Sequence, residues 1–318
     1  MFKRILLPLD SSKLAECVLP HLVAIAQICE PEVQLLRVLE PFGVTARMRM
    51  IDPVDWQIRK AEAESYLAGI ADRLQNAGLK VTYQLNEGRP AEQIIEAAQA
   101  WDADLILMSS HGQSGISPWN VSSVVQQVIM RAHRSFMIIR AYQPLTAELT
   151  GLRYHKIFLP LDGSPRAEMT LMLAESLAQA HNSEILVAHI VRQPELPRRT
   201  SASQEDLSLV NQLTQRNQAE AIKYLEDLQS RTNITIQTKL EISPSISRSL
   251  HQIAEENDID LAILSAHGYS GGTQWPFGSV GLGFIVYGSS PLIILQDLPM
   301  SRIELTRAEI AARETRGH

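Results

Sequence analysis

Short apolar runs alternate along this chain with longer stretches of helical period. The apolar run Ile5–Leu9 is followed by a stretch from Leu14 to Ile25 in which apolar residues recur every three or four positions. A second apolar run follows at 33–39. Apolar runs of this kind are typical of parallel strands with both faces covered, and the period between them is typical of an amphipathic helix. The pattern therefore predicts a strand–helix–strand unit.

The same pattern begins again in the middle of the chain. Lys3–Ser12 recurs as Lys156–Ser164, and Asp102–Gly112 recurs as Asp258–Gly268. The first pair is offset by 152 residues (162 minus 10) and the second by 156 (268 minus 112). Because the two copies of each segment are separated by nearly the same number of residues, the sequence indicates a duplicated domain.

Each repeat continues with further alternation of helices and strands. Irregular connections, which are either lids over a site or disordered, are predicted at 41–55 and 192–203. Alternation throughout predicts the α/β class, with a doubly wound five-stranded parallel sheet in each repeat. The predicted elements are long helices at 56–76 and 205–230, fourth strands at 105–108 and 261–264, and fifth strands at 136–140 and 292–295.

The repeats set the expected boundaries. Domain 1 is predicted at 1–143, a linker at 144–153 and domain 2 at 154–298. The tail at 299–318 contains the capping box Ser301–Glu304, which predicts a short amphipathic helix that packs on a domain or a partner, or frays in solvent. The fifth strands leave exposed apolar edges, so we expect them to pair with each other about a pseudo-twofold axis.

Composition excludes some classes of protein. The net charge of −6 argues against a general nucleic-acid binder, although a local basic patch stays open. Without an apolar run of about 18 residues we expect no membrane insertion, and Met1–Arg4 leads into a strand rather than a signal peptide. The two cysteines, Cys17 and Cys29, favour buried thiols in a reducing cytoplasm, with a redox pair as the alternative.

Two groups of polar and small residues are candidates for chemistry. An aspartate, Asp10 or Asp162, ends the first strand of each repeat. Ligands of doubly wound sheets bind beyond the carboxyl ends of the strands, where strand order reverses, so these aspartates are candidate ligand residues; a helix cap or a turn is the alternative.

The second group follows the fourth strand. Ser109-Ser-His-Gly112 is followed after nine residues by Ser122-Ser-Val124, and Ser265-Ala-His-Gly268 after nine residues by Gly278-Ser-Val280. Small residues let backbone amides approach a phosphate, and the second cluster would begin a helix whose amino terminus favours an anion. Neither a Walker P-loop nor a dinucleotide fingerprint is present.

With these motifs the chain resembles the universal stress protein family in its tandem two-domain form, from Met1 to about Leu298. The resemblance implies Rossmann-like domains of the adenine nucleotide alpha hydrolase-like fold, which bind ATP or AMP, with or without Mg²⁺, in some members and no nucleotide in others. The family's first motif glycine is replaced by Ser109 and Ser265, and the third by Ser122, while Gly278 is kept. The second repeat is therefore expected to be the better site.

By position, the resemblance implies specific nucleotide-binding residues. In the second repeat they are Pro160, Leu161, Asp162, Ser164, Ile190, Ser265, His267, Gly268, Gly278, Ser279 and Val280. The weaker set in the first repeat is Pro8, Leu9, Asp10, Ser12, Val38, Ser109, His111, Gly112, Ser122, Ser123 and Val124. No metal cluster and no catalytic residue is expected; Asp162 would meet a metal only through Mg-nucleotide.

The histidines and tryptophans near these motifs are expected to have structural roles or to contact the ligand. His111 and His267 are expected to shape the loop or touch phosphate, and Trp119 and Trp275 to cover the loop or stack on a base. We expect a cytoplasmic, non-enzymatic stress-response regulator whose interaction with an unidentified protein partner depends on adenine nucleotide. A homodimer of whole chains is expected. The alternatives are a nucleotide-free scaffold and a slow ATPase or autophosphorylating protein that uses Ser279.

Overall fold

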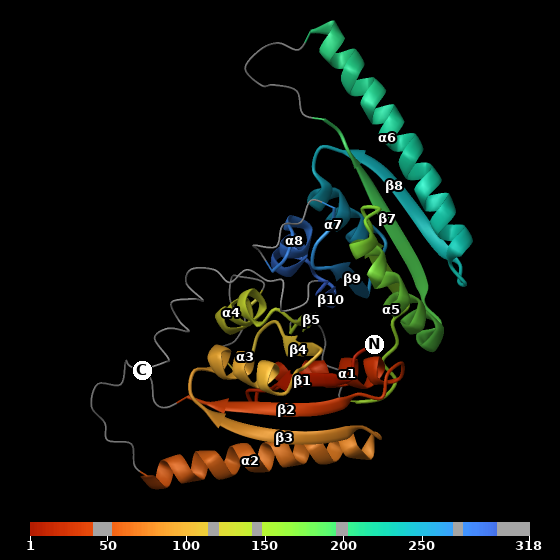
Figure 1. Ribbon diagram of the computed structural model, residues 1–318. Coiled ribbons are helices and arrows are strands. Elements are labelled where there is room, and N and C mark those ends of the chain that lie inside the picture. Colours follow the sequence, from red (N-terminus) through yellow and green to blue (C-terminus); the bar gives the residue numbers. More distant parts are fainter. Residues whose placement is uncertain (41–52, 114–120, 142–147, 195–202, 270–275, 298–318) are drawn as a thin grey trace. The chain divides into compact units, whose positions relative to one another are not determined.

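A computed structural model describes residues 1–40, 53–113, 121–141, 148–194, 203–269 and 276–297. Trp119, Trp275, most of the long connections and the predicted tail helix lie outside these residues. The described residues divide into two compact units. Of the described residues, unit 1 holds those within 1–153, Pro276 and 291–297, and unit 2 holds those within 154–269 and 277–290. Figure 1 shows helices and strands alternating through each.

Unit 1 is built in the predicted alternation. Its first helical segment begins with a 3-10 turn rather than as one continuous helix. The elements are β1 (Arg4–Pro8), η1 (Ala15–Cys17), α1 (Val18–Ala26), β2 (Glu32–Leu39), α2 (Pro53–Asn76), β3 (Lys80–Glu87), α3 (Pro90–Ala100), β4 (Leu105–Ser109), α4 (Ser123–Ala132) and β5 (Ser135–Ile139).

The sheet of unit 1 has the parallel order β3-β2-β1-β4-β5. The chain runs outward from β1 to β3 and then returns to the other side of β1, so strand order reverses between β1 and β4. Leu6 of β1 and Leu107 of β4 are fully buried at the centre of this sheet. The carboxyl ends of β1 and β4 therefore form the switch point at which such folds bind ligands.

A sixth strand closes the free edge of this sheet. β10 (Leu292–Leu295) runs antiparallel to β5, with Leu292 opposite Ile138 and Ile294 opposite Phe136. The predicted pairing of the two fifth strands is confirmed. An apolar edge that would invite aggregation is covered in this way.

Unit 2 repeats the alternation with the parallel strand order β9-β6-β7-β8. Ile157 of β6 and Ile263 of β9 are fully buried. The elements are β6 (Lys156–Pro160), α5 (Pro165–His181), β7 (Glu184–Arg192), α6 (Gln204–Arg231), β8 (Ile236–Ser243), α7 (Ile246–Glu256), β9 (Leu261–Ser265) and α8 (Ser279–Tyr287).

The helical period identified the helices of unit 2 but not always their buried faces. Met172 of α5 and Leu213 of α6 belong to the apolar period of their helices but are exposed, whereas Leu173 and Leu225 are buried. Both helices carry apolar residues on more than one face, so packing against the sheet decides which face is covered. Among the described residues, no helix combines the length and the apolar composition that a membrane span requires.

Candidate functional site

The aspartate after the first strand of unit 1 joins two loops. Asp10 Oδ1 accepts hydrogen bonds from the backbone N–H of Ser12 at 3.0 Å and from its hydroxyl at 2.6 Å. Asp10 Oδ2 accepts from the backbone N–H of Gln113 at 2.5 Å. Because Gln113 follows β4, this carboxylate clamps the loop after β1 to the loop after β4, at the point where strand order reverses.

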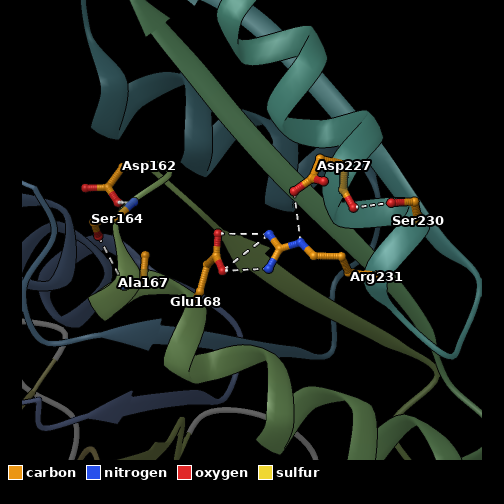
Figure 2. A network of polar contacts seen from close by, with 7 residues as sticks. All are labelled: Asp162, Ser164, Ala167, Glu168, Asp227, Ser230 and Arg231. Carbon is orange, nitrogen blue, oxygen red and sulfur yellow. Dashed lines mark hydrogen bonds and ion pairs between the residues drawn. The ribbon is translucent and has the colours of Figure 1, made fainter.

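Unit 2 contains the same clamp. Asp162 Oδ1 accepts from the backbone N–H of Ser164 at 3.0 Å, and Oδ2 accepts from the backbone N–H of Tyr269 at 2.6 Å. The Ser164 hydroxyl accepts from the N–H of Ala167 at 3.1 Å and caps α5 (Figure 2). The aspartate thus forms a local turn, as one alternative predicted, and the serine two residues later is the helix cap.

A glycine in each unit makes room for this clamp. A Cβ atom placed on Gly112 would lie 1.9 Å from Asp10 Oδ2, and one on Gly268 would lie 2.1 Å from Asp162 Oδ2. From the sequence, these glycines were expected to let backbone amides approach a phosphate. The structure shows a nearer cause, because the carboxylate already occupies the space that a side chain would need.

The serines that replace the family's first motif glycine stabilise the loop itself. The hydroxyl of Ser109 donates to the carbonyl of His111, and that of Ser265 to the carbonyl of His267, both at 2.6 Å. Each histidine is 2% exposed, and His111 Nδ1 lies 3.1 Å from the hydroxyl of Ser110. These buried rings are positioned to shape the loop.

The two units differ at the helix that follows the loop. Ser122 is the N-cap of α4, and its hydroxyl accepts from the backbone N–H of Val125 at 3.3 Å. Gly278 is the N-cap of α8 and provides no side-chain cap. The first N–H groups of a helix have no acceptor within the helix, so α8 offers an anion one donor more than α4 does. Ser123 and Ser279 follow the caps and are exposed.

A cavity of about 550 Å³ lies over the switch point of unit 1. Its volume falls within the range of small-molecule sites. Ser12, held by Asp10 and the start of η1, is not among its lining residues. The structure brings together the other predicted residues of the first repeat: Pro8, Leu9, Asp10, Val38, Ser109, His111, Gly112, Ser122, Ser123 and Val124.

Three charged residues of this wall were missed by the sequence analysis: Arg37, Glu40 and Arg59. Arg37 could have been recognised from the sequence as a candidate, because it is a charged residue within the apolar run of β2. Burial lowers the pKa of its guanidinium below the ordinary value, and the nearby Asp10 carboxylate opposes that shift. The guanidinium is thus held among apolar strand residues at the edge of the cavity.

His189 occupies the position in unit 2 that Arg37 occupies in unit 1. Pro8 of β1 pairs with Leu36, the residue before Arg37, and Pro160 of β6 pairs with Ala188, the residue before His189. His189 Nδ1 lies 2.8 Å from the carbonyl oxygen of Leu161. Burial lowers the pKa of His189 below 6.5, against the opposing effects of the Leu161 carbonyl and the Asp162 carboxylate. This side chain is engaged with the loop of its own unit.

A second polar network recurs beside each clamp. Glu16 pairs with Arg73 of α2 at 3.1 Å, and Glu168 of α5 pairs with Arg231 of α6 at 3.4 Å. Figure 2 shows the Arg231 guanidinium between Glu168 and Asp227, and the latter contact is 2.9 Å. These pairs tie the long helix of each unit to the segment that follows the aspartate. These ion pairs were not predicted, although the two glutamates are 152 residues apart (168 minus 16) and the two arginines 158 (231 minus 73).

The thiol of Cys17 lies beside the loop after β4. Its Sγ atom is 3.5 Å from the Ser109 hydroxyl, and burial raises its pKa to about 11 despite that contact. A protonated, buried thiol is a poor nucleophile at neutral pH. The environment of Cys17 therefore favours the buried-thiol interpretation over a redox pair.

Among the described residues, no group of three or more His, Cys, Asp or Glu side chains is arranged to hold a metal ion.

Several known proteins resemble this chain in sequence or in fold. The model of the universal stress protein family matches residues 1–140 and 153–294. A universal stress protein of Methanocaldococcus jannaschii is 26% identical over 155 residues, which are 44% of this chain and 96% of that protein. A universal stress protein structure from Archaeoglobus fulgidus has a TM-score of 0.64 at 18% identity, covering 92% of this chain and 98% of that one.

A further solved universal stress protein is a complex with cAMP. It is 18% identical, with a TM-score of 0.35, and covers 44% of this chain and 98% of its own. That ligand belongs to the other protein. The family assignment rests on the two matched ranges, which together span most of the sequence and coincide with the two repeats. The chain therefore belongs to the universal stress protein family.

Proposed function

We propose that this chain is a stress-response regulator that binds an adenine nucleotide, ATP or AMP, mainly in its second repeat, and that the nucleotide controls a protein partner. The uncapped amino terminus of α8 is the observation that carries the proposal. A helix amino terminus without a side-chain cap leaves N–H donors and a partial positive charge for a phosphate.

The surroundings of α8 support a phosphate at that position. The N–H of Gly278 donates to the carbonyl of Ala266 at 2.7 Å, which holds the start of α8 against the loop after β9. The same loop is held on its other side by Asp162 through Tyr269. The start of α8 and the loop after β9 are thus held in place before a nucleotide binds, so little conformational entropy is lost on binding.

We propose further that the nucleotide is bound and not rapidly hydrolysed. Asp162, the one carboxylate among the expected nucleotide-binding residues of the second repeat, already accepts two backbone hydrogen bonds and is poorly suited to act as a general base. Hydrolysis should be slower than about one per minute, well below the roughly 10 per second of a typical enzyme. Rapid phosphate release that disappears in Asp162→Ala would contradict this proposal.

The cytoplasm is the proposed compartment, and a homodimer of whole chains the proposed assembly. The pKa of Cys17, raised to about 11, suits a thiol that stays reduced. Light scattering at micromolar concentration tests the assembly; the mass of a single chain would refute the homodimer.

The binding proposal is tested by calorimetry on the intact chain with ATP, ADP and AMP, together with mass analysis of any nucleotide released by acid. We expect micromolar affinity, about −8 kcal/mol, with nearly one adenine nucleotide per chain. Gly278→Glu should abolish adenine nucleotide binding in the second repeat, because a bulky carboxylate would cover the amino terminus of α8.

Comparing Asp162→Ala with Asp10→Ala tests which repeat binds the adenine nucleotide. Asp162→Ala should cost more adenine nucleotide affinity than Asp10→Ala, since the second repeat is the proposed site. Equal losses would refute the assignment to that repeat. Absence of heat with all three nucleotides would favour a scaffold without ligand.

A further inference from the structure

The wall of the unit 1 cavity contains a guanidinium that lacks an acceptor. Arg37 is half-buried, and its Nε atom is shielded from solvent without a hydrogen-bond partner. Within the described part of the chain, Arg37 forms no hydrogen bond and no ion pair. A shielded N–H without an acceptor costs free energy, and a ligand atom that accepts from it would recover that cost.

The charges around Arg37 favour a neutral acceptor over a second phosphate. Asp10, Glu40, Tyr66 and Arg59 are the groups whose electrostatic effects reach its guanidinium. Two of them are carboxylates on the same cavity wall, and they balance the two guanidinium groups. A phosphate at this end would be repelled by both carboxylates, whereas a neutral edge that accepts from Arg37 and donates to Glu40 would meet matching partners.

The position of these residues suits the base of a nucleotide. The amino terminus of α4, which follows β4, is the part of the cavity suited to a phosphate. β2 lies two strands away from β4, with β1 between them, and two strand spacings amount to about 10 Å. That separation is comparable with the one between the 5′-phosphate and the base of a mononucleotide, so a phosphate near α4 directs the base toward the end of β2.

We propose that the cavity of unit 1 binds a 6-oxopurine nucleotide, one with guanine or hypoxanthine as its base, in preference to an adenine nucleotide. A 6-oxopurine presents the acceptors O6 and N7 side by side, the pair that a guanidinium binds through two parallel hydrogen bonds. Adenine places an amino donor where O6 would be, opposite the N–H donors of Arg37. Glu40 then accepts from N1–H of the 6-oxopurine.

Unit 2 lacks this arrangement. His189 replaces Arg37 and is held by the carbonyl of Leu161. At the same offset of 152 residues, Arg192 replaces Glu40, so the acceptor for N1–H is absent as well. The two repeats therefore keep one phosphate-binding plan and differ in the side chains that meet the base. This inference goes beyond the proposed adenine site in unit 2 and depends on it only in that the fold binds nucleotides.

The experiment compares GMP with AMP, which carry the same single phosphate, on the intact Gly278→Glu chain in which the unit 2 site is blocked. By calorimetry, GMP should bind at least about tenfold more tightly than AMP. Arg37→His, which introduces the residue of the second repeat, should lower GMP affinity about tenfold and leave AMP affinity within about threefold. Arg4→His, at the opposite end of the sheet, is the matched control and should change neither.

The outcomes separate the two proposals. Equal affinities for AMP and GMP, or a GMP to AMP ratio that Arg37→His leaves unchanged, would overturn the inference while leaving adenine binding in unit 2 intact. If the Gly278→Glu chain binds neither GMP nor AMP, the inference about unit 1 is likewise overturned, and adenine binding in unit 2 is left intact. Tighter binding of adenosine 3′,5′-bisphosphate than of GMP would show that the arginines bind a second phosphate, and would also overturn it. If Arg37→His fails to fold, Glu40→Gln must selectively lower GMP affinity.

Discussion

The two repeats share a backbone clamp and differ in the side chains around it. Asp10 and Asp162 accept the same pair of backbone hydrogen bonds, with Gly112 and Gly268 making room for the carboxylates. The helix cap and the charged wall of the cavity are different in each repeat. Features that hold the loops are thus maintained in both copies, whereas features that would meet a ligand have changed, and this division allows each repeat a ligand of its own.

Filling the space beside the carboxylate should have the largest effect. Gly268→Ala places a Cβ atom 2.1 Å from Asp162 Oδ2, so the clamp cannot form as observed. We expect the affinity for ATP, measured by calorimetry, to fall about a hundredfold, roughly 3 kcal/mol. Gly112→Ala should leave ATP binding almost unchanged, because its clamp lies in unit 1.

Gly278→Ala is the control for this prediction. Its Cβ atom would lie 3.6 Å from the carbonyl oxygen of Ala266, an ordinary contact, so affinity should stay within about threefold. If Gly268→Ala binds ATP as the wild type does, the clamp has no part in nucleotide binding.

A half-buried histidine, His21, should make unit 1 sensitive to acid. Burial lowers the pKa of His21 to about 4, and at the offset of 152 residues the second repeat has Leu173. Because the folded state resists protonation, its contribution to stability is complete above pH 6.5 and is lost as the pH falls toward 4. The shift corresponds to about 3 kcal/mol, and since the ring is partly exposed we expect a loss of about 2 kcal/mol.

The measurement is denaturant unfolding at pH 7 and pH 4.5 for the wild type and His21→Leu. The variant should lose less stability than the wild type between these values. An identical pH dependence in both would show that His21 does not couple folding to protonation.

Exchanging the caps should have a moderate effect. Gly278→Ser copies Ser122, and its hydroxyl would accept from the backbone N–H of Gly281 as that of Ser122 does from Val125. With one donor fewer for the phosphate, ATP affinity should fall about fivefold, roughly 1 kcal/mol. Ser122→Gly should change stability by only a few tenths of a kcal/mol, measured by thermal unfolding. Tighter ATP binding by Gly278→Ser would contradict the role assigned to the uncapped helix.

The ion pairs between the long helices and the aspartate segments should have the smallest effect. Glu16→Gln should cost about 0.5 kcal/mol, because the pair is partly exposed and screened by salt. Glu168→Gln should cost less, since Arg231 keeps its contact with Asp227. Thermal unfolding at low and at high salt measures both; a larger loss for Glu168→Gln would contradict the compensation by Asp227.

Much of the fold follows from local sequence. The apolar runs of β1 and β6 are buried as predicted, and the two predicted fifth strands pair with each other. These features depend on the period of apolar residues and on repetition, both of which are visible along the chain. The buried faces of α5 and α6 were less predictable, because both helices carry apolar residues on several sides.

The duplication, the helix–strand alternation of a doubly wound sheet and the loops that carry the candidate site could all be predicted from the sequence. The folded chain was needed to show that Gly112 accommodates Asp10 and that Arg37 lines the cavity. Both arrangements join residues that lie far apart along the chain. Asp10 meets Gln113 across 103 residues, and Arg37 of β2 shares a cavity with α4, so these contacts depend on how strands associate and not on local pattern.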